Sequence, residues 1–102
     1  FDILLCPTTV CSAFDHDHHH DFHGRNVMVN EVERPYSDLI VWPGLANAGQ
    51  LPATNVPIGL SSDNMPIGMQ IIGPYLEDRT TIKFAKLITE ITGGFLPPIP
   101  YN

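Results

Sequence analysis

The chain has 102 residues, of which 16% are charged, and its 11 acidic against 5 basic side chains give a formal net charge of −6. This length fits one domain at most, and the shortage of Lys and Arg argues against binding to a nucleic-acid backbone. No apolar run approaches the roughly 20 residues that span a bilayer, and 43% hydrophobic residues exclude a compositionally disordered chain.

The first predicted element is a strand over residues 3–6. These residues form a continuous apolar run, Ile-Leu-Leu-Cys, which ends at Pro7 and is typical of a strand buried on both faces. Cys6 and Cys11 are too few for a disulfide scaffold and form no CxxC pair. We therefore expect two reduced thiols, with Cys6 buried and a bridge between the two as the alternative.

Residues 13–33 show no sustained helical or strand periodicity, which predicts a surface loop. The segment 15–23 contains all five histidines of the chain, interleaved with aspartates. Imidazole and carboxylate groups are suitable ligands for zinc, nickel or copper, and the candidate set is His16, His18 and His20. Their spacing matches no specific metal-binding template, so we favour a solvated loop that binds metal only incidentally, with a functional metal module as the alternative.

A kinked or two-part helix is predicted over residues 36–49. Ser37 is a candidate N-cap, and Asp38 would lie at the positive end of the helix dipole. Pro43 removes a backbone donor and breaks the regularity of this segment. One face would carry the apolar side chains of Leu39, Trp42, Leu45 and Ala46.

A β-hairpin is predicted next, with strands over residues 51–59 and 66–73 and turn residues at 61–64. Pro57 would place the first strand at a sheet edge or a bulge, because proline cannot donate to the strand ladder. The second strand would present alternate residues to opposite faces, with Ile67, Met69 and Ile71 on one face and Gly68, Gln70 and Ile72 on the other.

The last predicted element is a helix that starts near Asp78, its N-cap candidate, and ends at Gly93. Residues 95–102 contain three prolines and are expected to pack as an extended tail. The helix would bury an apolar stripe of Ile82, Ala85, Ile88 and Ile91, flanked by Phe84 and Leu87.

The chain offers no credible catalytic group. A serine nucleophile needs a pre-positioned hydroxyl, a desolvated base and oxyanion donors. Ser61 and Ser62 fall in the hairpin turn, and the only lysines, Lys83 and Lys86, fall on the polar side of the last helix. We therefore expect turn formation and solvation at these positions.

Several stretches match a known pattern in order. Leu-Pro-Ala at 51–53, Val-Pro-Ile-Gly at 56–59 and Pro-Ile-Gly-Met-Gln-Ile-Ile-Gly at 66–73 closely resemble G-L-P-A-x-x-V-P-x-G and G-x-P-x-G-x-Q-I-x-G, motifs of the amidase signature family. Residues 2–8 resemble its D-x-L-L-x-P-T strand, and residues 36–38 its Y-x-D helix. Two positions depart from the pattern, since the family often has Ala where this chain has Pro43 and usually has Gly where it has Gln50.

The resemblance implies an α/β fold. The chain would be the C-terminal part of a mixed, mostly parallel amidase-signature sheet flanked by helices, in the order strand, loop, helix, β-hairpin, helix. Residues 1–102 would form the C-terminal segment of a single amidase-signature domain. This segment would be incomplete, because the catalytic signature lies upstream and is absent.

The family hydrolyses a carbon–nitrogen amide bond with a serine nucleophile, a bridging serine with a cis peptide, and a lysine base. All of these would lie upstream, so we expect no catalytic residue in this chain, no activity of the chain alone, and no cofactor. In the family the Y-x-D helix approaches the substrate pocket, and in the glutamine-using branch its Asp reads the substrate's amino group. Asp38 and Trp42 are therefore candidate substrate-binding residues, with helix N-terminal stabilisation and core packing as their respective alternatives.

Charge is unevenly distributed, since Asp63 is the only charged residue between positions 39 and 76. We expect other protein to cover much of this stretch, and the chain alone to expose apolar faces. The expected partners are a small-molecule amide and the rest of the parent amidase chain, with a homo-oligomer left open and with no nucleic acid or membrane. The leading hypothesis is the C-terminal segment of an amidase-signature hydrolase that acts on a small amide, and the expected location is cytoplasmic. The alternatives are a His-rich metal-binding module and part of an amidotransferase A-type subunit.

Overall fold

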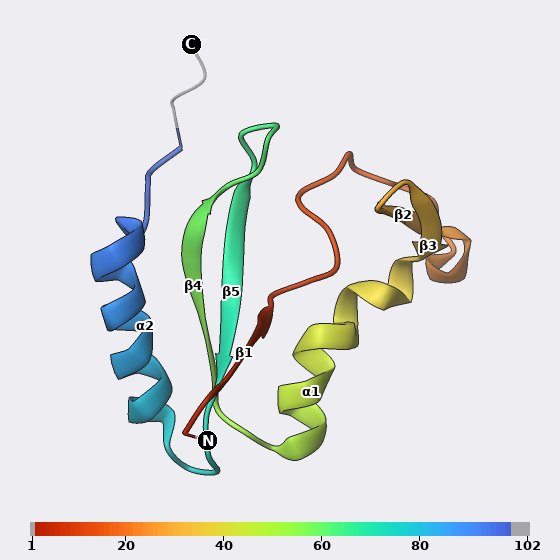
Figure 1. The fold of residues 1–102 in the computed structure, drawn as a ribbon. Coiled ribbons are helices and arrows are strands. Elements are labelled where there is room, and N and C mark those ends of the chain that lie inside the picture. The colour runs from red at the N-terminus through yellow and green to blue at the C-terminus, as the bar shows by residue number, and fades with distance from the viewer. Residues whose placement is uncertain (1, 99–102) are drawn as a thin grey trace.

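The computed structural model describes residues 2–98 of the chain. It has the predicted α/β class and the predicted order of strand, loop, helix, hairpin and helix (Figure 1). The elements are β1 (Leu4–Pro7), the 3-10 helix η1 (Phe22–Gly24), β2 (Asn26–Val29), β3 (Val32–Pro35), the 3-10 helix η2 (Tyr36–Ile40), α1 (Val41–Gly49), β4 (Ala53–Leu60), β5 (Pro66–Ile72) and α2 (Asp78–Thr92).

The main sheet has three strands in the order β1-β5-β4, and β2 and β3 form a separate two-stranded sheet. Every one of these pairs is antiparallel. The parallel pairs that the resemblance implies for a whole domain are therefore not among the pairs of residues 2–98. The central strand β5 is the only strand of the main sheet, within those residues, with a partner on each side.

The β4–β5 hairpin confirms the prediction for residues 51–73. Its turn closes through Ser61, whose backbone N–H donates to the Met65 carbonyl at 2.8 Å and whose hydroxyl accepts from the Met65 N–H at 3.1 Å. Pro57 lies in an edge strand, and the register shifts between Pro57 and Gly59. Both expectations for this proline are thus met, because its missing donor is tolerated where no further strand pairs.

Two helices cover opposite faces of this sheet, so that β5 lies between them (Figure 1). Alternate β5 residues supply the two cores, as the alternation predicts. On the α2 face, the fully buried Ile71 clusters with Val56 and Ala85. On the α1 face, Ile72 clusters with Cys6 and Ala46.

The buried face of α2 differs from the predicted stripe. Ala85 is buried and both Phe84 and Ile88 pack against the core, but Ile82 is 59% exposed and Ile91 is 83% exposed. Residues spaced three apart each lie about 60° further around the helix than the one before, so the stripe from position 82 to 91 winds around the helix axis. Residues spaced by alternating steps of three and four stay on one side of the helix.

Both ends of α2 are defined by backbone geometry. The N-cap residue is Glu77, not Asp78, and its side chain makes no cap bond to the helix backbone. Asp78 instead lies in the first turn, where a carboxylate still complements the helix dipole. Gly93 ends the helix as predicted, with a left-handed φ of 85° that glycine adopts without a steric penalty.

The predicted loop over residues 13–33 contains a hairpin, which corrects that prediction. Strands β2 and β3 are joined by two residues, Asn30 and Glu31, whose φ angles of 50° and 66° give the left-handed turn that short hairpins prefer. Val27 is 3% exposed and anchors β2. The local signal for these strands is the pair Val27 and Val29 before the turn and Val32 after it.

Strand β1 begins one residue later than predicted and is not buried on both faces. Leu4 is 54% exposed and Leu5 is 44% exposed, while Cys6 alone is buried. The reason is that β1 pairs only with β5 and forms an edge of the described sheet. The cysteine prediction is confirmed, because Cys6 and Cys11 are both free thiols.

Apolar side chains are exposed over much of the described surface, as expected, including Ile40, Leu76 and Phe95. No helix within residues 2–98 combines the length and the apolar character needed to cross a membrane. The predicted extended tail is described only up to residue 98, and that part has no regular structure. Its remaining residues, 99–102, lie outside the described part of the chain.

Candidate functional site

The two candidate substrate-binding residues lie on the predicted two-part helix. Asp38 belongs to η2 and Trp42 to α1, and α1 ends at Gly49 as expected. Pro43 is the third residue of α1, within the first turn, where backbone N–H groups have no intrahelical acceptor. Proline is therefore tolerated without breaking α1. Ser37 is not the cap that was predicted, because the N-cap position of η2 is Pro35.

Asp38 forms an ion pair with the preceding strand. Its carboxylate accepts a hydrogen bond from the Arg34 Nε at 2.8 Å, and the Asp38 side chain is 21% exposed against 55% for Arg34. An ion pair whose guanidinium is more than half exposed is screened by solvent and contributes about 0–1 kcal/mol. The pair between Arg34 and Asp38 is therefore a weak one.

Trp42 packs against the core formed by Cys6, Ala46 and Ile72. Its backbone carbonyl accepts a hydrogen bond at 3.0 Å from Nε2 of Gln70, which also lies 3.3 Å from the Cys6 sulfur. Gln70 is only 3% exposed. A single buried amide therefore ties the first turn of α1 to the centre of the sheet.

The sequence indicated the face on which Gln70 lies but not its role. A glutamine in an alternating strand is an ordinary polar residue until its partner is known, and that partner is 28 positions away in sequence. Buried polar groups are nearly always hydrogen-bonded. A polar residue between apolar neighbours on a core-facing strand is the only local signal that could have identified it.

The histidine tract does not form a metal centre in the described residues. All five histidines are exposed, and within residues 2–98 no three His, Cys, Asp or Glu side chains surround a common point suited to a metal ion. The rings of His16 and His18 meet edge to face at 5.8 Å, whereas His20 stacks on His19 at 4.8 Å. His16 and His18 are thus neighbours, but His20 lies against His19 and the three candidate ligands do not share one point.

Contacts of the tract with its own loop account for its shape. Nδ1 of His19 accepts the backbone N–H of Asp21 at 3.2 Å, and Nε of Arg25 donates to the His19 carbonyl at 2.8 Å. The rings of Phe14 and Phe22 both meet Tyr36 edge to face, with centroids 6.2 and 5.3 Å away. These aromatic contacts fasten the loop to the start of η2.

The side chains that could act as nucleophiles lie in varied surroundings. Partial burial raises the pKa of the Cys11 thiol, which lowers its thiolate fraction at neutral pH. Ser61 is used by the hairpin turn, and both Lys83 and Lys86 are exposed. These positions behave as the sequence predicted, and no nucleophile–base pair is found among them.

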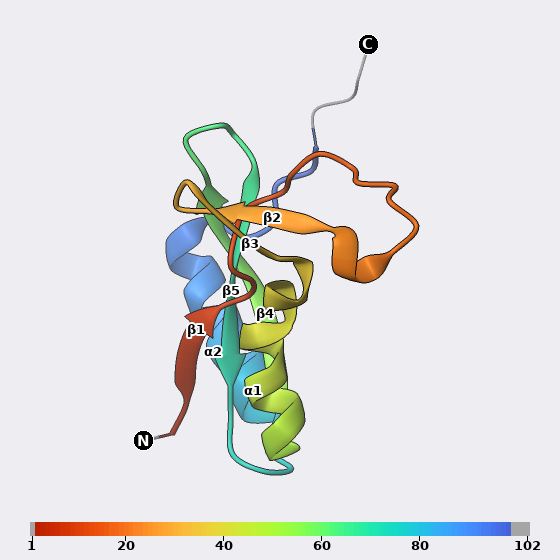
Figure 2. The ribbon, with the colours of Figure 1, turned by 90° about the vertical axis from the view of Figure 1, so that its right-hand side faces the viewer.

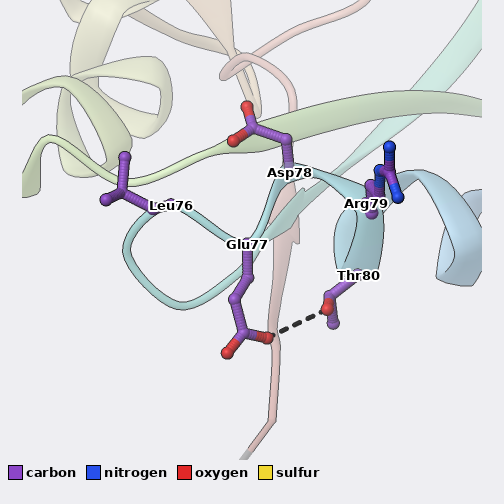
Figure 3. Close-up of a pocket in the computed structure, with 5 residues that line it drawn as sticks. All are labelled: Leu76, Glu77, Asp78, Arg79 and Thr80. Carbon is purple, nitrogen blue, oxygen red and sulfur yellow. Dashed lines mark hydrogen bonds between the residues drawn. The ribbon is translucent and has the colours of Figure 1, made fainter.

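Among the hollows of the described part of the chain, two lie in different segments. One, of about 340 Å³, is lined by residues 13–18 together with Tyr36. The other, of about 450 Å³, lies at the start of α2 and is lined by residues 76–80 (Figure 3). There Glu77 accepts a hydrogen bond from the Thr80 hydroxyl at 3.0 Å, and Figure 3 shows the Glu77 and Asp78 carboxylates pointing away from each other.

Comparison with known proteins gives a consistent result. A model of the Amidase family matches residues 1–82. The A subunit of glutamyl-tRNA(Gln) amidotransferase from Ehrlichia chaffeensis is 33% identical over 95 residues, which are 93% of this chain and 17% of that protein. The corresponding A subunits from Xanthobacter autotrophicus and Synechococcus sp. are 34% identical over 94 residues and 37% identical over 84 residues. Those alignments cover 92% and 82% of this chain, which spans only 17% and 15% of the two relatives.

Proposed function

The chain belongs to the Amidase family, and we therefore propose that it is the C-terminal portion of an amidase-signature enzyme that hydrolyses the carbon–nitrogen bond of a small amide. The family match over residues 1–82 carries this proposal. We call the longer polypeptide of which this chain would be a part the parent chain. The relatives are long enough to be such parent chains, because the part of the Ehrlichia chaffeensis protein that this chain matches is 17% of that protein.

Catalysis would be performed by residues of the parent chain outside these 102 positions. The chemistry expected there is attack by a serine, with a bridging serine and a lysine as proton carriers. This placement is supported by the described residues, since Ser61 takes part in the hairpin turn and Lys83 and Lys86 lie on exposed helix surface. The 102-residue chain by itself is therefore expected to be inactive.

The contribution of this chain would be one wall of the substrate pocket, formed by Asp38 and Trp42. Asp38 supports this role because its partly buried carboxylate has a weak, exchangeable partner in Arg34. A substrate ammonium group would replace the guanidinium and form a charge-assisted hydrogen bond. Trp42 would supply an apolar surface beside it, held in place by Gln70 through the Trp42 carbonyl.

A second candidate is the A-type subunit of an amidotransferase. It is favoured by the names of the relatives, which are A subunits of glutamyl-tRNA(Gln) amidotransferase at 33–37% identity. Both candidates begin with hydrolysis of an amide, but they differ in substrate. The amidotransferase would use an amide that carries an amino group, which Asp38 is suited to read.

The test is ammonia release by the parent chain from a panel of amides with and without an amino group, such as L-glutamine and propionamide. We expect Asp38→Asn to raise KM by about 10- to 100-fold for the amino-bearing amides only, which corresponds to the loss of a charge-assisted hydrogen bond. Asp63→Asn in the exposed hairpin turn removes the same charge and serves as the control. A parent that releases no ammonia from any amide would refute the proposed function.

We also propose a cytoplasmic location, which the two free thiols support because reduced cysteines are usual in that compartment. Association of the parent chain into a homo-oligomer stays a prediction. Size-exclusion chromatography of the parent with light scattering measures it directly.

A further inference from the structure

The segment that follows β1 is bonded to the short helix that carries Asp38. The hydroxyl of Thr9 donates to the backbone carbonyl of Leu39 at 3.2 Å, in a partly buried position. Figure 2 shows the segment after β1 running beside the start of α1. The two residues are 30 positions apart in sequence, so this bond holds η2 against a distant part of the chain.

The Leu39 carbonyl lacks its α-helical donor because of Pro43. Leu39 lies in η2, and α1 begins at Val41. In an α-helix that ran through both elements, the Leu39 carbonyl would accept from the backbone N–H of residue 43. Proline has no N–H, and a buried carbonyl without a donor costs free energy. The Thr9 hydroxyl therefore takes the place of the donor that Pro43 lacks.

The rest of η2 is held by weak contacts. Aromatic rings contact its first residue, Tyr36, but none of its five residues is buried and no side chain caps its N-terminus. A 3-10 helix also has poorer hydrogen-bond geometry than an α-helix, and the ion pair between Asp38 and Arg34 is weak. The position of the Asp38 carboxylate therefore depends on the bond to the adjacent residue, Leu39.

We propose that Thr9 is a positioning residue for substrate binding, which keeps the Asp38 carboxylate in place for the amino group of the substrate by holding the Leu39 carbonyl. This inference rests on the proposed function, in which Asp38 reads that amino group. Trp42 has a separate bond to the sheet through Gln70. Loss of the Thr9 hydroxyl should therefore affect recognition of the amino group and not of the amide.

Ammonia release by the parent chain tests this role with two neighbouring threonines. Thr9→Val keeps the branched shape and removes the hydroxyl. We expect it to raise KM for L-glutamine by about 3- to 10-fold, as for the loss of one net hydrogen bond, with kcat unchanged. KM for propionamide, which has no amino group, should stay within about 2-fold of the wild-type value. Thr9→Ser keeps the hydroxyl and should restore the wild-type KM. Thr8→Val is the matched control, because the Thr8 hydroxyl donates to Oδ1 of the exposed Asn55 at 3.1 Å and not to η2.

A merely structural role of Thr9 gives a different result. General destabilisation affects both amides alike, so equal changes for L-glutamine and propionamide in Thr9→Val would overturn the inference, as would no change for either. The double variant Thr9→Val/Asp38→Asn tests the dependence on Asp38. Once Asp38 is replaced, Thr9→Val should have no further effect on KM for L-glutamine, and additive effects would also overturn the inference.

Hydrogen exchange on the parent chain gives a second measurement, which needs no activity. The Val41 amide donates to the Asp38 carbonyl at the end of η2, so a loosened junction exposes it to exchange. We expect Thr9→Val to speed exchange of this amide by about 3- to 10-fold and Thr8→Val to leave it unchanged. An unchanged Val41 amide in Thr9→Val would overturn the inference. A faster Val41 amide in a parent that releases no ammonia contradicts only the proposed function.

Discussion

Removal of the Gln70 amide tests whether it anchors α1 to the sheet. Gln70 is 3% exposed, and its Nε2 donates to the Trp42 carbonyl at 3.0 Å. Gln70→Leu keeps a similar volume but leaves that carbonyl without this donor in a partly buried position. Loss of one partner of such a bond costs about 1–2 kcal/mol. We therefore expect the free energy of unfolding of the chain to fall by about that amount.

Gln70→Glu sharpens the test, because the new carboxylate would lie beside the same carbonyl without a donor. Desolvation disfavours the charged form and raises the folded-state pKa of this introduced carboxyl above the unfolded value of about 4.3. The deficit should therefore be smallest below that unfolded value, should grow between the unfolded and the folded-state pKa, and should level off above the folded-state pKa. At pH 7 we expect a loss of at least about 2 kcal/mol.

The assay is urea unfolding followed by the fluorescence of Trp42, the only tryptophan of the chain. For a urea slope of about 2 kcal/mol per molar, Gln70→Leu should lower the midpoint by about 0.5–1 M. Asn47→Leu is the control, since it replaces an exposed amide side chain of α1. Equal midpoints for Gln70→Leu and the wild type would refute a stabilising role for this hydrogen bond.

Three further predictions concern backbone geometry and the thiols. Gln50 has a left-handed φ of 51°, so Gln50→Gly should relieve strain and raise the stability by about 0.5–1 kcal/mol in the same urea assay, and a loss would contradict this. A Cβ on Gly73 would lie 2.5 Å from Cγ2 of the buried Thr81, so Gly73→Ala should cost about 1–3 kcal/mol of unfolding free energy, and a neutral effect would be inconsistent with this packing. Because Cys6 is buried and the pKa of Cys11 is raised, both thiols should react with a disulfide reagent at pH 7 more slowly in the folded chain than in urea. The reaction of Cys11 should accelerate as the pH rises. Reaction of Cys6 at the unfolded rate would refute its burial.

Features that depend on local geometry could be predicted from the amino-acid sequence. The two faces of β5 followed from alternation, because successive side chains of a strand point to opposite sides. The edge position of Pro57 followed from the missing backbone donor of proline. Family membership was also predicted from the sequence, since short motifs in a fixed order around the hairpin indicated it. The family match over residues 1–82 agrees with that prediction.

Contacts between groups far apart in the chain could be known only from the folded structure. The choice of Ala85 over Ile82 as a core residue of α2 depends on the angle at which the helix lies on the sheet. The bond between Gln70 and Trp42 joins residues 28 positions apart, and no local pattern encodes such a contact. The arrangement of the five histidine side chains could likewise not be predicted, because the shape of this surface loop depends on contacts within the loop itself. Local chemistry decided which β5 side chains share a face, and the packing of distant elements decided what each side chain touches.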